Sequence, residues 1–128
     1  MGNTDVVRAA YAAFEVGNVP AVLGALAEDI EWTEAEGFPM AGTYRGHDEV
    51  VQSVFMPLAQ DYDGFTVKPD GFVAEGDTVI STGWYEGTYK ATGKVARARF
   101  AHVWQLRNGK ATRFEQIVDS GAFNQALS

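Results

Sequence analysis

The sequence predicts an α+β domain in which helices pack on one face of a curved antiparallel sheet. Apolar residues recur at helical spacing in the first sixty positions and alternate with polar residues from about residue 65 onward. Gly-rich turn signals separate these segments. A run of helices followed by a run of strands is typical of the α+β class. We find no repeat, low-complexity segment or linker and expect a single domain over residues 1–128.

Two helices are expected first. Residues 4–16 place four side chains on one apolar stripe: Val7, Ala10, Tyr11 and Phe14. Gly17 is a stop signal, and Asn18 is a suitable N-cap for a second helix, whose apolar spacing continues to Ile30. The tight connection between them predicts a helical hairpin with an apolar inner side.

A short strand over residues 30–34 and a Gly/Pro loop follow this hairpin. A third helix is expected after Gly46, and Pro57 should bend it or end its regular part, because proline lacks the amide hydrogen that a helix uses. The three helices are expected to cover the concave face of the sheet. Asp119 is expected to cap a short C-terminal helix.

The β half is expected to form a four-strand antiparallel meander that opens at 65–67 and continues at about 78–90, 95–106 and 111–118. In the last hairpin, a three-residue loop with left-handed Gly109 places His102 on the same face as Gln116, which burial favours. In the preceding hairpin, a two-residue loop at Thr92-Gly93 pairs Tyr85 with Phe100. It also places Gly83 opposite His102, where the missing side chain would leave a gap.

Composition excludes several function classes. The chain has 128 residues, no cysteine and a net charge of −7. It therefore lacks thiolate metal sites and the basic surface that a nucleic-acid binder needs. No apolar run approaches the length of a membrane span, and Asp5 stands where a signal peptide would carry a basic residue. We expect a cytoplasmic protein with no cofactor or metal and no nucleic-acid or membrane partner.

The concave surface is the expected site. Three polar groups, Glu34, Tyr85 and His102, are the candidate catalytic residues, because a few polar groups converging in an apolar cleft are typical of small-molecule sites. Burial beside an aromatic wall would raise the pKa of Glu34 and make it a better base. The candidate ligand-binding residues are Tyr11, Phe14, Trp32, Phe55, Phe100, Trp104, Phe114 and Gln116.

Each candidate also has a structural interpretation. His102 can be a core histidine satisfied by a neighbouring hydroxyl, and Gln116 a half-buried strand amide. Glu34 lies among other acidic residues between positions 28 and 36, and such a run is often a solvated edge. The spacing of His47 and His102 does not suggest a metal site.

The chain resembles SnoaL-like proteins of the nuclear-transport-factor-two-like superfamily, which also holds ketosteroid isomerases, epoxide hydrolases and polyketide cyclases. The resemblance rests on residues 11–18, 27–32, 44–48 and 100–119, including Phe100-Ala101-His102-Val103-Trp104. It implies a cystatin-like, cone-shaped α+β barrel with a deep apolar pocket, and a homodimer joined through the outer sheet face. The outward positions expected at such an interface are Ala101, Val103, Ile117, Ile80 and Trp84.

The resemblance extends to single positions only in part. Glu34 falls where ketosteroid isomerases have their Asp base, whereas Ala10 and His102 stand at their oxyanion-binding positions. His102 also matches the histidine of SnoaL-type cyclases, but Gln116 stands at their aspartate.

The Arg and Asp of the epoxide hydrolases are replaced by Gly83 and Tyr85.

Three functions therefore stay open. The first is an isomerase or aldol-type cyclase in which Glu34 removes a proton next to a carbonyl, and His102 and Tyr85 stabilise the enolate. The second is a dimeric carrier of a small apolar molecule. The third is a protein-interaction adaptor whose pocket is filled by its own side chains.

Overall fold

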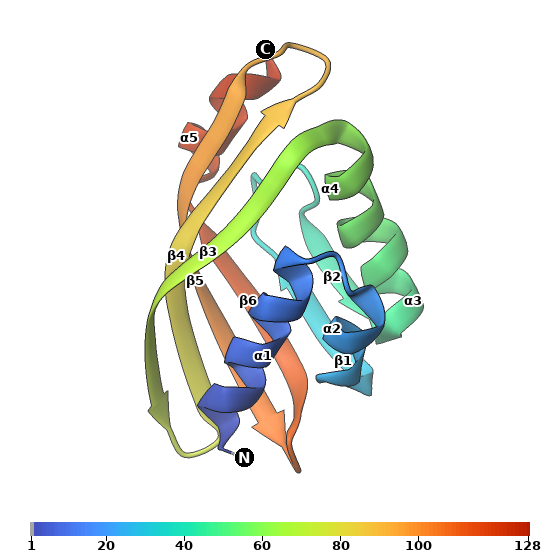
Figure 1. Cartoon of the computed structure of the whole chain (residues 1–128), viewed down its shortest axis with the longest axis vertical. Coiled ribbons are helices and arrows are strands. Elements are labelled where there is room, and N and C mark those ends of the chain that lie inside the picture. Colours follow the sequence, from blue (N-terminus) through green and yellow to red (C-terminus); the bar gives the residue numbers. More distant parts are fainter. Residues whose placement is uncertain (1) are drawn as a thin grey trace.

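The computed structural model describes residues 2–128 and confirms the α+β class. The helices lie on one side of a curved sheet (Figure 1). The helical elements are α1 (Asn3–Glu15), α2 (Val19–Gly24), α3 (Gly46–Val50), the π-helix η1 (Val51–Phe55), α4 (Met56–Asp61), α5 (Ser120–Asn124) and the 3₁₀-helix η2 (Gln125–Leu127). None of the helices in residues 2–128 is long and apolar enough to cross a membrane.

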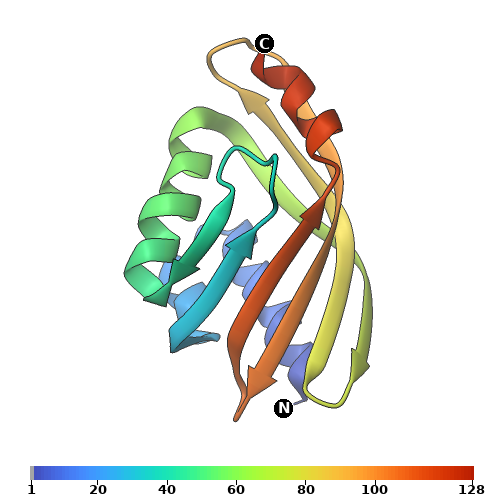
Figure 2. The ribbon, with the colours of Figure 1, turned by 180° about the vertical axis from the view of Figure 1, so that it is seen from behind.

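The sheet has six strands in the order β2-β1-β6-β5-β4-β3, and β2 and β3 lie at its two open edges. The strands are β1 (Leu26–Glu34), β2 (Gly42–Arg45), β3 (Tyr62–Glu75), β4 (Thr78–Tyr89), β5 (Val95–Arg107) and β6 (Lys110–Val118). All neighbours are antiparallel except β1 and β6, which run side by side in the same direction (Figure 2). The expected meander is therefore present, and the N-terminal strands extend it through this one parallel pair.

The start of β1 corrects the expected end of the second helix. That helix stops at Gly24, and β1 already begins at Leu26, where the amide of Ala111 on β6 donates to the carbonyl of Ala25 at 2.8 Å. Pairing with a strand distant in sequence thus overrides the helical spacing that runs to Ile30. The expected loop is also shorter, because its last residues form β2.

The third helix continues through Pro57 by widening rather than by ending. The amide of Met56 donates to the carbonyl of Val51, five residues earlier, and η1 lies between the two regular segments α3 and α4. A π-turn changes the register of the helix just before the proline, whose ring would clash with a regular turn. The apolar face is kept, because Val54, Phe55 and Leu58 are all buried.

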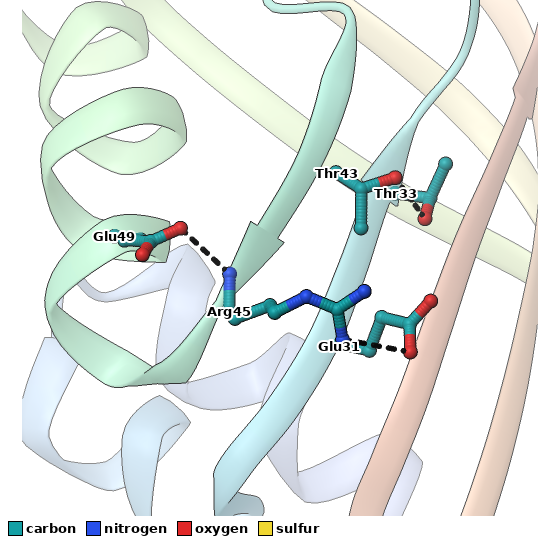
Figure 3. A network of polar contacts seen from close by, with 5 residues as sticks. All are labelled: Glu31, Thr33, Thr43, Arg45 and Glu49. Atoms are coloured by element: carbon teal, nitrogen blue, oxygen red, sulfur yellow. Dashed lines mark hydrogen bonds and ion pairs between the residues drawn. The ribbon is translucent and has the colours of Figure 1, made fainter.

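The edge pair β1–β2 is fixed by a small polar network on its outer side (Figure 3). The hydroxyls of Thr33 and Thr43 are 3.0 Å apart, and Arg45 forms an ion pair of 3.2 Å with Glu31. The carboxylate of Glu49 accepts the backbone amide of Arg45 at 2.9 Å, at the start of α3. The network joins β1, β2 and α3 at this edge of the sheet.

The side chains of β4, β5 and β6 point to the expected faces of the sheet, although the predicted lengths of both hairpin loops are wrong. Asn108 and Gly109, with φ of 53° and 78°, form a two-residue turn, and a bulge at Thr112 restores the pairing of His102 with Gln116. The preceding turn spans residues 90–93, since the amide of Tyr89 donates to the carbonyl of Lys94. The register therefore differs by two residues from the predicted one.

This shift corrects the prediction for Gly83. The glycine lies opposite Phe100, and His102 lies opposite Ser81. A Cβ atom at Gly83 would stand 2.2 Å from the carbonyl oxygen of Lys68 and 2.6 Å from the ring of Phe100. There is thus no gap at this position; glycine is needed because β3 and the Phe100 ring approach the backbone closely.

Candidate functional site

A cavity of about 60 Å³ lies between the concave face of the sheet and the helices. Its wall comes from α1, α2, β1, the loop after β1, the helical segment 51–58 and strands β3 to β6, and it is almost entirely apolar. The polar side chains that line it are Tyr11, Glu34, Tyr85, His102 and Gln116, together with the indoles of Trp32 and Trp104. An apolar cavity with a few polar groups has the usual form of a small-molecule site.

Glu34 reaches the cavity because side chains alternate along β1. Ile30, Trp32 and Glu34 point inward and are buried, while Glu31 and Thr33 between them are half-buried on the outer side. Burial raises the pKa of Glu34 from its ordinary value of 4.5 to about 8, although a hydrogen bond from the Trp32 indole to Oε2 at 3.2 Å opposes the shift. The structure thus supplies a carboxyl group that gains and loses its proton near neutral pH.

His102 lies between two tyrosine hydroxyls and does not itself present a free nitrogen to the cavity. Its Nδ1 is 2.5 Å from the Tyr11 hydroxyl, and its Nε2 is hydrogen-bonded to the Tyr85 hydroxyl. The ring stacks on Phe100 with a centroid distance of 4.0 Å. Burial lowers the pKa of His102 well below its ordinary value of 6.5, so the imidazole is neutral.

Gln116 fixes the position of Tyr85. The backbone amide of Ala35 donates to Gln116 Oε1 at 2.9 Å, which determines the orientation of the side-chain amide. Its Nε2 therefore donates to the Tyr85 hydroxyl at 3.0 Å. Burial, and secondly the negative charge of Glu34, raise the pKa of Tyr85 well above its ordinary value of 10, so the phenol keeps its hydrogen.

The hydrogens of this network can be arranged in two ways, because a neutral imidazole donates from one nitrogen and accepts at the other. If Nε2 carries the hydrogen, Ser81 donates to Tyr11, Tyr11 donates to Nδ1, and Nε2 donates to Tyr85. The hydroxyl hydrogen of Tyr85 is then free for an acceptor in the cavity. A bound carbonyl oxygen would satisfy it.

If Nδ1 carries the hydrogen, every step is reversed, and the hydroxyl hydrogen of Ser81 is left over. Ser81 is completely buried, and its recorded partners are the Tyr11 hydroxyl and the indole of Trp104, which donates to it at 3.1 Å. An unpaired buried hydroxyl costs about 1–3 kcal/mol. The arrangement with a hydrogen on Nε2 is therefore favoured whenever an acceptor occupies the cavity.

With a small ketone bound in the cavity to accept from Tyr85, replacing Ser81 with Ala should lock this arrangement, because the Tyr11 hydroxyl then keeps only Nδ1 as an acceptor. We expect ¹⁵N NMR of the variant to show His102 protonated at Nε2 and unprotonated at Nδ1. Thr82→Ala, on the opposite face of the same strand, is the matched control. A hydrogen on Nδ1 in the Ser81 variant would contradict the arrangement.

The structure brings together all but one of the residues predicted for the site. The three candidate catalytic residues Glu34, Tyr85 and His102 line the cavity, and so do seven of the candidate ligand-binding residues: Tyr11, Phe14, Trp32, Phe55, Trp104, Phe114 and Gln116. Phe100 does not line the cavity; its ring stacks on the rings of Tyr85 and His102. Asp119 caps α5 as expected, accepting the amide of Ala122 at 3.0 Å.

Phe38 is the lining residue that was least accessible to sequence reasoning. It lies in the Gly/Pro loop between β1 and β2, where side chains are usually exposed, yet it is buried against Phe123 with a centroid distance of 4.7 Å. Its large apolar side chain between Gly37 and Pro39 was the one available signal. Among residues 2–128, no group of three His, Cys, Asp or Glu side chains is placed to hold a metal ion.

Comparison with known proteins identifies the family. The model of the SnoaL-like domain matches residues 7–114. An NTF2-like protein from Burkholderia thailandensis E264 has 44% identity and a TM-score of 0.96, with 100% of this chain and 98% of that chain covered. An NTF2-like protein of unknown function from Burkholderia pseudomallei K96243 has 32% identity and a TM-score of 0.91, with 100% and 99% covered.

A third solved structure contains an organic ligand. TerC, co-crystallised with polyporic acid, has 30% identity and a TM-score of 0.88, with 98% of this chain and 97% of that chain covered. No curated protein matches the chain. The matched family model spans most of the sequence, and these relatives share the whole fold. The chain belongs to the SnoaL-like domain family.

Proposed function

We propose that the protein is an enzyme that moves a proton at the carbon next to a carbonyl group in a small hydrophobic molecule. One observation carries the proposal: a buried carboxyl group, Glu34, and a buried phenol, Tyr85, line the same apolar cavity. A base near its pKa and a fixed hydroxyl donor are the two groups that enolate formation needs. Crystallisation of the relative TerC with polyporic acid supports the expectation that this scaffold takes an organic ligand.

In the proposed reaction, the carbonyl oxygen accepts the hydroxyl hydrogen of Tyr85. Glu34 Oε2 already accepts from the Trp32 indole, whereas no hydrogen bond is recorded for Oε1 within residues 2–128. Oε1 removes the proton from the carbon next to the carbonyl, and the electron pair of that C–H bond forms the enolate. Return of the proton from Glu34 to the same carbon gives exchange, and its return to another carbon of a conjugated enolate gives isomerisation. If the enolate carbon instead attacks a second carbonyl of the same molecule, the alkoxide that forms takes the proton from Glu34, and the outcome is aldol-type cyclisation.

His102 and Tyr11 act through Tyr85 in this proposal. They accept and pass on hydrogen bonds so that the Tyr85 hydroxyl hydrogen is directed to the substrate and not to the imidazole. The ordered network holds this donor in place before the substrate binds, and a pre-positioned donor stabilises an oxyanion more strongly than water does. His102 is therefore a positioning residue, although the sequence suggested that it would contact the enolate.

The test is exchange of the hydrogens next to the carbonyl of small ketones for deuterium, followed by ¹H NMR in D₂O. We expect the protein to accelerate exchange, with a rate that rises with pH, is half-maximal near pH 8 and levels off above it, as Glu34 loses its proton. Glu34→Gln should reduce the rate roughly 10²- to 10⁴-fold while ketone binding is retained.

Glu31→Gln is the matched control, because Glu31 lies on the same strand and points to the outer side. An unchanged rate in the Glu34 variant would exclude Glu34 as the base. Binding of ketones without exchange at any pH would exclude the enzyme and leave a non-catalytic binding protein.

A further inference from the structure

The inner cavity is too small for a whole substrate. Its volume of about 60 Å³ is well below the volume of about 300–1,000 Å³ that small-molecule sites usually have. The cavity can therefore take the carbonyl end of a ligand and little more. The rest of the ligand must lie elsewhere.

A second, open hollow of about 310 Å³ lies directly beside the cavity. It is bordered by the end of α1 and the turn after it, by α4 and by the start of β3. Four residues line both spaces: Phe14, Phe55, Leu58 and Phe65. The two spaces are thus the inner and outer parts of one depression, separated only by these side chains.

The separating side chains are apolar, and the outer part is open to solvent. The rings of Phe14 and Phe55 pack edge to face with a centroid distance of 5.6 Å, and Phe14 and Phe65 are only half-buried. Glu15 is the one charged residue at the hollow, and it is exposed at the rim. Val19, Ala59 and Tyr62 supply further apolar surface on the outer side. The inner and outer volumes together reach the usual size of a ligand site.

We propose that the substrate is a carbonyl compound with an apolar chain or ring that extends from the inner cavity, between Phe14 and Phe55, into the outer hollow. The carbonyl end lies near Glu34 and Tyr85, and in this respect the inference rests on the proposed function. Ala59, whose side chain is exposed in the outer hollow and absent from the inner lining, is then a specificity-determining residue for the apolar part.

The test is binding of methyl ketones of increasing length, from acetone through 2-pentanone to 2-nonanone. Tryptophan fluorescence reports binding, because Trp32 and Trp104 line the inner cavity. Affinity should rise roughly fourfold for each added methylene until the outer hollow is filled.

Ala59→Phe fills the outer hollow and should weaken 2-nonanone binding by about tenfold or more, with acetone binding unchanged. Gln60→Phe, at an exposed neighbouring position that does not line the hollow, is the matched control and should leave both affinities unchanged.

Two results would overturn the inference: an affinity that does not depend on chain length, or an equal loss for short and long ketones in the Ala59 variant. These binding measurements need no proton transfer. A normal length dependence without deuterium exchange would overturn only the proposed function. Exchange without a length dependence would overturn only this inference.

Discussion

Above pH 8, Glu34→Gln is expected to raise the free energy of unfolding by about 5 kcal/mol. The carboxyl group has an ordinary pKa of 4.5, which we take for the unfolded chain, and a folded pKa of about 8. Between these values the folded protein holds a proton that the unfolded chain releases. The stabilising effect of this proton is complete below pH 4.5 and is lost as the pH rises through 8.

Glutamine cannot ionise, so the variant escapes this loss and can still accept the Trp32 indole hydrogen. The difference in unfolding free energy should be small below pH 4.5 and should grow by about 1.4 kcal/mol per pH unit up to pH 8. Urea denaturation of both proteins across this range measures it, with Glu31→Gln as the control for loss of a carboxylate on the same strand. A difference that does not change with pH would show that the folded structure does not raise the pKa of Glu34.

Gly83→Ala is expected to destabilise the protein by about 3 kcal/mol or more. The new Cβ would meet backbone on one side, the carbonyl oxygen of Lys68 at 2.2 Å, and the ring of Phe100 at 2.6 Å on the other. The backbone of β3 cannot move aside as a flexible side chain can. A displaced Phe100 ring would also disturb His102 and Tyr85, on which it stacks. We therefore expect both the stability and the order of the site to be lost.

Thermal unfolding measures the effect of the Gly83 substitution. Gly24→Ala is the matched control, because a Cβ there meets no atom within 4 Å and the backbone has no positive φ. The control should unfold within a few degrees of the unmodified protein. A Gly83 variant as stable as the unmodified protein would mean that the backbone of β3 does not approach Gly83 as closely as the structure shows.

The alternation of side chains explains why most of the site was predictable. A strand presents every second residue to the same face, so burial of Phe100 and Trp104 was enough to place His102 inside. The hairpin prediction with Gly83 opposite His102 was wrong by two residues, and a shift of two keeps every side chain on its face. The lining was therefore predicted even though cross-strand partners were not.

Contacts between distant segments were not predictable in the same way. The parallel pairing of β1 with β6 and the hydrogen bond between Tyr11 and His102 join residues far apart in the chain. Local spacing carries no information about such partners. For the same reason, the sequence suggested that His102 would contact a ligand, whereas both its nitrogens are bound by tyrosine hydroxyls.

The division of the ligand site into two parts was also beyond the sequence. The third helix was expected to cover the concave face of the sheet, but spacing alone does not distinguish a packed wall from one that borders two hollows, as Phe55 and Leu58 do. Phe38 could not be predicted for a similar reason. It lines the cavity because the loop between β1 and β2 folds over it, and the sequence does not predict the path of that loop.

Titration of the Glu34 side chain tests the account most directly. The carboxyl carbon can be followed by ¹³C NMR in protein labelled at glutamate, with Glu34→Gln used to assign its signal. The buried position in the apolar cavity predicts a midpoint near pH 8. A midpoint near 4.5, the ordinary value for a solvated carboxyl, would mean that water reaches Glu34 freely and that the cavity holds no base suited to this chemistry.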